Sequence, residues 1–258
     1  MQGFRFASLG SGSRGNALVV EAGNTRVLLD CGFGSRELNS RLERLGLFIE
    51  DFAAILVTHE HSDHSAGVFK CARRHQIKVH MTHGTFAALS ESQGALPSLC
   101  LIDTHQTLTV GDLEIHPYPV PHDAREPVQF VFSDGMHRLG VLTDTGCVTP
   151  HIVTMLSACD ALVLECNHDL DMLDNSPYPW TLKQRIRGRY GHLDNRASAN
   201  LLAGLDHSRL QHVIAAHLSE QNNTPQRVRA ALASVLKCEE EWIGVATQDD
   251  GFDWRELK

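Results

Sequence analysis

The chain has 258 residues, of which 42% are hydrophobic and 21% are charged, and this composition excludes disordered, collagen-like and low-complexity architectures. The formal net charge of −8 at pH 7 repels nucleic acid and anionic lipid unless a local patch or a bound cation overrides it. No apolar run approaches the roughly 20 residues that cross a bilayer, and the N-terminal residues lack the pattern of a secretory signal. We therefore expect a cytoplasmic protein that does not associate with membranes.

The first third of the chain predicts short strands that are separated by glycine-rich turns. These strands cover residues 4–9, 17–21 and 25–30. A helix over 35–46 follows, in which leucines recur at helical spacing and Gly46 ends the pattern. The next expected elements are a buried strand over 53–58, a helix over 64–75, a strand over 77–81 and a short helix over 85–91.

The rest of the chain is first rich in strands and then alternates between strands and helices. Strands are expected over 113–120, 128–133 and 138–143, with Asp134 and Gly135 in a hairpin turn, and then over 160–165 and 212–216. Helices are expected over 182–189, 195–205 and 225–236, and residues 175–180 read as a loop. Strand clusters with helices on both flanks predict an α/β fold of two packed sheets, as one domain over residues 1–258.

Two residue types stand out. The seven cysteines are scattered without a C-x-x-C pair, which favours buried reduced thiols over a disulfide framework or a zinc ribbon. The 16 histidines are unusually many, and several of them cluster. Because histidine is the commonest metal ligand and general acid or base, we expect the site among them.

The decisive segment runs from His59 to His64 and follows an apolar strand. It places three histidines and Asp63 within six positions, so that lone-pair donors converge in the way a metal site requires. The alternative is a solvated polar loop before a helix that Asp63 or Ser62 caps. Capping does not explain three histidines, so we interpret the segment as metal-binding.

With its H-x-H-x-D-H pattern at residues 59–64, the sequence resembles the metallo-β-lactamase superfamily. Four further motifs of that family occur in the expected order. They centre on Asp30 in L-L-D-C-G, His122 in V-P-H-D, Asp144 in L-T-D-T-G, and His217 at the end of a late strand. The resemblance implies an αββα sandwich, in which two mixed sheets are flanked by helices, and it implies that Asp30 supports the metal loop by hydrogen bonding.

The same resemblance implies two divalent metal ions. One would be held by His59, His61 and His122, a second by Asp63, His64 and His217, and Asp144 would bridge them. A donor set of nitrogen and oxygen without thiolate suits zinc, which we expect first, and also manganese or iron. Such a pair supports hydrolysis by metal hydroxide, which Asp63 would orient.

Two more residues resemble the tRNA 3′-processing ribonucleases of the superfamily. Glu165 ends a buried strand, and His192 stands just before a helix. The resemblance implies that Glu165 orients His192 and keeps it protonated as the general acid for the leaving oxygen. The alternative is a structural ion pair.

Three further features each allow two interpretations. His168 is either a substrate contact or a loop residue, and the basic stretch 183–189 either binds phosphate or forms a solvated face. The Gly-rich loop 8–16 is either an anion-binding nest or a turn.

The whole chain resembles the YycJ/WalJ-like branch of the superfamily. It shares the early S-G-S-x-G-N loop, E-x-N-H-D at residues 165–169, and H-L-S-x-x-N-N at residues 217–223. The branch implies a nuclease or phosphodiesterase, most specifically a 5′ to 3′ DNA exonuclease acting on single-stranded or end-exposed DNA. The alternatives are a hydrolase of a cyclic phosphodiester, thioester or lactam, and a metal-bound scaffold without turnover.

Overall fold

The computed structural model describes residues 3–258, and within them the strands form two seven-stranded sheets. The first sheet has the order β14 (Phe252–Glu256), β1 (Arg5–Gly10), β2 (Ala17–Ala22), β3 (Thr25–Leu29), β4 (Ala54–Leu56), β5 (Lys78–Met81) and β6 (Leu99–Leu101). The second has the order β13 (Gly244–Val245), β12 (His212–Ala216), β11 (Ala161–Glu165), β10 (Arg138–Leu142), β9 (Val128–Ser133), β8 (Leu113–Pro119) and β7 (Leu108–Val110). Both sheets mix parallel and antiparallel pairs.

The two sheets pack face to face over a shared apolar core. Alternate residues of β2 illustrate the pattern, because Leu18 and Val20 join the core between the sheets whereas Val19 faces the other way. From the second sheet, Phe130 and Phe132 fill the same core and are fully buried. Since the residues on the outer faces are also apolar, each sheet needs a second covering layer.

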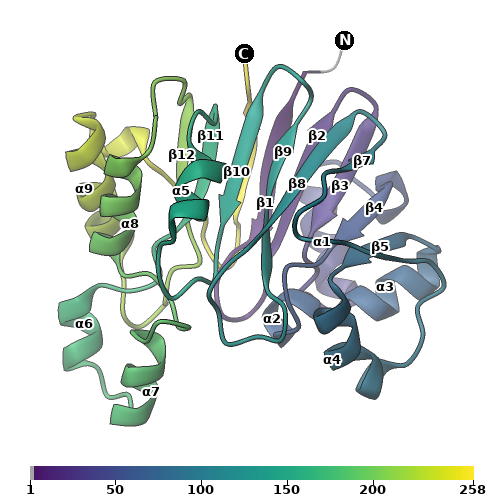
Figure 1. Cartoon of the computed structure of the whole chain (residues 1–258), viewed down its shortest axis with the longest axis horizontal. Coiled ribbons are helices and arrows are strands. Elements are labelled where there is room, and N and C mark those ends of the chain that lie inside the picture. The colour runs from purple at the N-terminus through teal and green to yellow at the C-terminus, as the bar shows by residue number, and fades with distance from the viewer. Residues whose placement is uncertain (1–2) are drawn as a thin grey trace.

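Helices supply that layer on both outer faces (Figure 1). On the first sheet lie α1 (Ser35–Arg44), α3 (Val68–His75) and α4 (His83–Gln93), with the short 3-10 helix η1 (Ile49–Asp51). The short helix α2 (Ser62–Ser65) lies at one end of the sandwich (Figure 1). On the second lie α5 (Pro150–Leu156), α8 (Asn195–Gly204) and α9 (Pro225–Leu236), with η2 (Glu240–Trp242). The expectation of two mixed sheets flanked by helices is confirmed.

Two more helices, α6 (Leu170–Asn175) and α7 (Trp180–Ile186), project beyond one end of the sheets (Figure 1). The sequence analysis missed α6, whose first turn is capped by Asp169 as its side chain accepts from the Met172 N–H. It also missed β14, which pairs antiparallel with β1 at the edge of the first sheet. Both elements are short, so their periodicity is too brief to predict them from sequence.

The helix expected over 64–75 is divided into α2 and α3 at Gly67. A Cβ at this position would lie 2.2 Å from the Phe33 carbonyl oxygen and 2.7 Å from Cys31 Sγ. The Gly67 N–H instead donates to the Cys31 carbonyl at 2.8 Å. Because glycine has no side chain, the residues that follow β3 can lie this close to Gly67. The helix is interrupted at this point.

All seven cysteines are free. Four of them are buried as expected, whereas Cys100, Cys147 and Cys238 are partly exposed. Within residues 3–258, no helix combines the length and the apolar character that a bilayer crossing needs.

We predict that Phe130→Ala lowers the free energy of unfolding by about 3–5 kcal/mol, because it opens a cavity between the two sheets. Met136→Ala is the control, since 74% of Met136 is exposed and its loss should change stability by less than about 0.5 kcal/mol. Urea titration of the metal-free protein measures both. Equal stability losses in the two variants would contradict the assigned core.

Candidate metal centre

The carboxyl ends of six strands from both sheets meet at the end of the sandwich where α2 lies (Figure 1). Asp30 directly follows β3, and the His59–His64 segment follows β4. On the facing sheet the positions that follow the strands are His122 after β8, Asp144 after β10, Glu165 at the end of β11 and His217 after β12. Ligand sites in α/β proteins favour this edge.

Three of these residues have a left-handed backbone. The φ angles are 61° at Asp30, 52° at Asp144 and 55° at His217. A non-glycine residue rarely adopts this region, and doing so costs on the order of 1–3 kcal/mol. The rest of the fold offsets this cost. The chain turns sharply at each of these strand ends, and the turn directs the side chain into the centre.

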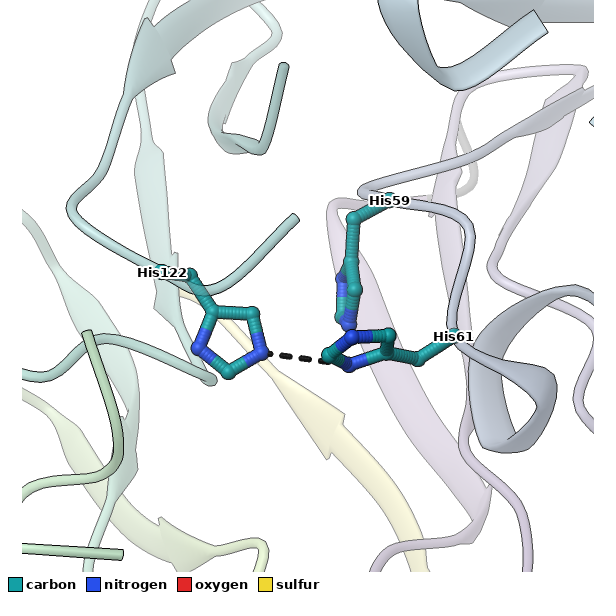
Figure 2. A group of neighbouring side chains, drawn as sticks. All are labelled: His59, His61 and His122. Carbon is teal, nitrogen blue, oxygen red and sulfur yellow. Dashed lines mark hydrogen bonds between the residues drawn. The ribbon is translucent and has the colours of Figure 1, made fainter. Parts of the chain in front are cut away.

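The first cluster consists of His59, His61 and His122, and one ligand atom from each lies within 4.8 Å of the others. His59 and His61 come from the loop after β4 and face His122 from the other sheet (Figure 2). His122 Nε2 lies 3.3 Å from His61 Nδ1. Three imidazoles on two facing loops thus share one small volume.

The second cluster consists of Asp63, His64 and His217. His217 Nε2 lies 3.4 Å from Asp63 Oδ2, and His64 Nε2 lies 3.5 Å from the same oxygen. Asp144 lies between the clusters, with Oδ2 3.1 Å from His64 Nε2 and Oδ1 4.0 Å from His122 Nε2. The structure therefore brings together all seven residues that the sequence assigned to metal binding.

Hydrogen bonds hold the inner histidines with Nε2 toward the centre. His64 Nδ1 donates to Asp30 Oδ2 at 2.7 Å, and His122 Nδ1 donates to the Gly191 carbonyl at 3.1 Å. His59 Nδ1 lies 3.0 Å from Thr58 Oγ1, which itself bonds Asp30. Fixing one ring nitrogen in this way orients the other as a ligand. The expected hydrogen-bonding support from Asp30 is confirmed.

The buried carboxylates stabilise positive charge at neighbouring groups. Burial lowers the pKa of His217, but Asp144, Asp63 and Glu165 oppose it and raise that pKa to about 10. Burial likewise opposes charge on His64, yet Asp144 and Asp30 raise its pKa well above the usual value. Without metal ions, protons on these two rings balance the carboxylates, and a divalent cation can take their place.

In the first cluster, by contrast, the neutral form of a histidine is stabilised. Burial and nearby His64 lower the pKa of His59 well below its usual value, so the ring is neutral and its lone pair is available. Its Nε2 is buried and has no hydrogen-bond partner among residues 3–258. An unpartnered buried nitrogen is costly, and a metal ion would satisfy it. The nitrogen and oxygen donors therefore fit divalent cations.

Glu165 and His192 form a pair beside these clusters. His192 Nδ1 donates to Glu165 Oε1 at 2.8 Å and lies 3.6 Å from Asp144 Oδ1. Burial raises the pKa of Glu165, but contacts with His192 and His217 outweigh this effect and bring it to about 2. Glu165 is therefore a buried carboxylate that orients His192, and no bond within residues 3–258 engages His192 Nε2.

Sequence analysis missed the role of Asn16 in the loop before β2. Its backbone N–H donates to the Asp63 carbonyl at 2.7 Å, and its side-chain amide lies 3.3 Å from Asp63 Oδ2. In the same loop, Ser11 Oγ accepts from the His217 N–H at 2.9 Å. The S-G-S-x-G-N motif was the sequence signal that marked this loop. In the folded chain, the loop connects the ends of the two sheets.

That loop is a packed turn rather than an anion-binding nest. The N–H groups of residues 10, 11, 12, 14, 15 and 16 all donate to oxygens of the protein itself. None of these six remains for a phosphate.

The basic stretch 183–189 and His168 are the other two features with two interpretations. Lys183 bonds two backbone carbonyls, while Arg185 and Arg187 pair with Asp123 and Asp174. His168 is 1% exposed, neither ring nitrogen has a partner within residues 3–258, and burial lowers its pKa to about 4. It is not part of the clusters above.

Asp123 was also missed, although it follows His122 directly. Its Oδ1 lies 3.5 Å from His122 Nε2 and 3.7 Å from His61 Nε2, so it adds a carboxylate to the outer side of the first cluster.

Comparison with known proteins agrees with this geometry. The family model described as "Beta-lactamase superfamily domain" matches residues 25–217. The chain belongs to the metallo-β-lactamase superfamily. It is 34% identical to an exodeoxyribonuclease YycJ of Bacillus anthracis, over 94% of this chain and 92% of that protein. It is 32% identical to an exodeoxyribonuclease WalJ of Streptococcus pneumoniae, with the same coverage.

Solved structures of the superfamily share the fold. YhfI from Bacillus subtilis, a metallo-β-lactamase fold protein, aligns with a TM-score of 0.78 over 100% of both chains at 16% identity. As a member of the metallo-β-lactamase superfamily with these clustered ligands, the protein is a hydrolase that depends on divalent metal ions.

We predict that Gly32→Ala destabilises the protein by about 1–3 kcal/mol and weakens metal binding. A Cβ there would lie 1.8 Å from the Asp63 carbonyl oxygen and 2.8 Å from the Asn16 backbone nitrogen, so the loop carrying Asp63 must move. Gly34→Ala is the matched control, because a Cβ at Gly34 meets nothing within 4 Å. Urea titration and chelator competition compare the variants, and equal behaviour would contradict this packing.

Proposed function

We propose that the protein is a 5′ to 3′ DNA exonuclease that uses two zinc ions, with manganese or iron as the alternatives. The observation that carries the proposal is the oriented His192, 3.6 Å from the carboxylate that lies between the two ligand clusters. The similarity to two proteins named exodeoxyribonucleases, over nearly their full length, supports DNA as the substrate. We also propose that residues 1–258 form one domain.

The ligand assignment follows the clusters. We assign His59, His61 and His122 to one ion, Asp63, His64 and His217 to the other, and Asp144 to both. When bound, two divalent ions supply an acidified water and neutralise charge on the phosphate. They also add about +4 of local charge, which offsets the net −8 of the chain where the phosphate enters.

Asp63 orients the attacking water in this proposal. Burial raises its pKa, but His64 and His217 outweigh that effect and hold the pKa well below its usual value, so it is a carboxylate. These contacts engage Oδ2. No hydrogen bond within residues 3–258 uses Oδ1, which is therefore available to accept from water.

His192 donates the proton to the leaving oxygen. Glu165 Oε1 accepts a hydrogen bond from Nδ1 and thereby orients the ring with Nε2 directed away from that carboxylate. An alkoxide leaves poorly unless it is protonated, whereas a thiolate leaves without help. The retained pair therefore favours phosphodiester chemistry over thioester chemistry.

We predict that the metal-reconstituted protein releases mononucleotides progressively from the 5′ end of single-stranded DNA. Single-turnover digestion of 5′- and 3′-labelled strands measures rate and polarity. Asp63→Ala should abolish cleavage, and His192→Ala should slow it by about 10²–10⁴-fold, the usual contribution of a general acid. His207→Ala is the control, because this histidine is exposed and lies outside the ligand clusters.

Three results would contradict the proposal. They are no DNA cleavage with zinc, manganese or iron, release from the 3′ end, and a His192→Ala rate equal to that of His207→Ala. Parallel assays with bis-para-nitrophenyl phosphate, a thioester and nitrocefin would show whether a different hydrolysis takes place.

A further inference from the structure

A narrow pocket lies beside His192 and is not part of the ligand clusters. It has a volume of about 190 Å³ and runs between α7 and the loops that follow β1, β11 and β12. We call it the α7 slot and define it by Tyr178, Leu182 and Ile186 on the α7 side, and by Ser13, Asn167 and Ser219 on the loops, with His192 at its end.

We propose that the α7 slot binds the nucleobase of the nucleotide that leaves, which on a 5′ to 3′ exonuclease is the 5′-terminal one. This inference rests on the proposed function and adds the position of the substrate. Pockets for drug-sized ligands measure about 300–1,000 Å³, so a slot of about 190 Å³ takes one flat group rather than a whole nucleotide.

The slot has the chemistry that a nucleobase requires. Tyr178, Leu182 and Ile186 offer aromatic and apolar surface to the face of a base. Asn167 offers a polar group to its edge, because its Nδ2 donates to the His217 carbonyl at 3.0 Å while no bond within residues 3–258 occupies its Oδ1. Ser13 and Ser219 add hydroxyl groups. Among residues 3–258, the carboxylate of Asp123, the guanidinium of Arg185 and the imidazole of His192 are the side chains bordering the slot that can carry charge near neutral pH.

The charge around the slot suits the phosphate that accompanies the base. Residues 180–191 contain one lysine and three arginines. Lys183 bonds backbone carbonyls and Arg187 pairs with Asp174, so Arg185 is the cation of this stretch that lines the slot. Arg185 lines the slot and bonds Asp123 through Nε only, at 2.7 Å, with 61% of its side chain exposed. Its two terminal amino groups remain for a phosphate oxygen, and exposed ion pairs of this kind are weak enough to rearrange.

Its position relative to His192 decides which nucleotide enters. In the reaction, the water oxygen forms a bond to phosphorus and gives one proton to solvent, while the bond from phosphorus to the 3′ oxygen of the terminal nucleotide breaks. The electron pair stays on that 3′ oxygen, and His192 supplies its proton. A base attached to this nucleotide lies on the His192 side of the phosphate, where the slot is.

The test compares two oligonucleotides that differ only in the 5′-terminal residue, which is either deoxyadenosine or an abasic tetrahydrofuran. For each enzyme form, kcat/KM for release of the first residue gives the ratio of the intact to the abasic substrate. Because both values come from one preparation, a partly unfolded variant does not distort the ratio. We expect about tenfold for the wild-type holoenzyme, which corresponds to about 1.4 kcal/mol.

Leu182→Trp fills the slot and should lower this ratio to about one. Tyr178→Ala removes the aromatic wall and should lower it too, which keeps the test valid if the tryptophan variant does not fold. Gln184→Trp is the matched control, because Gln184 is exposed on the same helix and does not line the slot. It should keep the tenfold ratio.

Two results overturn the slot assignment while leaving the exonuclease intact. One is a wild-type ratio near one during normal 5′ release, and the other is an unchanged ratio in both Leu182→Trp and Tyr178→Ala. If the wild-type protein cleaves neither oligonucleotide, the proposed function itself is wrong, and the slot has no leaving nucleotide to bind.

Discussion

The structure depends on one electrostatic constraint, which is the burial of carboxylates at the junction of the two sheets. Asp144 is 2% exposed and Glu165 is fully buried. Uncompensated buried charges destabilise a fold strongly. Here they are compensated by the protons that His64 and His217 hold at raised pKa values, or by divalent cations in their place. Metal binding and folding are therefore coupled in this protein.

The αββα sandwich makes that constraint achievable. Its core fixes the two sheets, and the carboxyl ends of their strands carry ligands from both sides into one centre. The Ser11–Asn16 loop then contacts Asp63 and His217 on opposite sheets. Catalytic groups held by strand ends and by such hydrogen bonds need little rearrangement when substrate binds, which is the basis of electrostatic preorganisation. The helix α7 projects beyond the sheets and adds the α7 slot, in which the base of the leaving nucleotide would lie.

Much of this could be predicted from the sequence, and the reasons differ by residue. The His59–His64 segment is specific on its own, whereas His122 and His217 were assigned only through the resemblance to the metallo-β-lactamase superfamily. Asn16 acts through a contact with Asp63, 47 positions away. The S-G-S-x-G-N motif marks its loop but does not reveal this distant partner. Arg185 of the basic stretch likewise has a distant partner, Asp123, which it meets only in the folded chain. Short elements such as α6 and β14 depend on capping and edge pairing rather than on periodicity.

The most direct test is a crystal structure of the zinc-reconstituted protein with anomalous data collected at the zinc edge. We predict two anomalous peaks, one among His59, His61 and His122 and the other among Asp63, His64 and His217, with Asp144 contacting both. A single peak at saturating zinc, or zinc bound only outside these clusters, would contradict the two-ion centre on which the proposed hydrolysis depends.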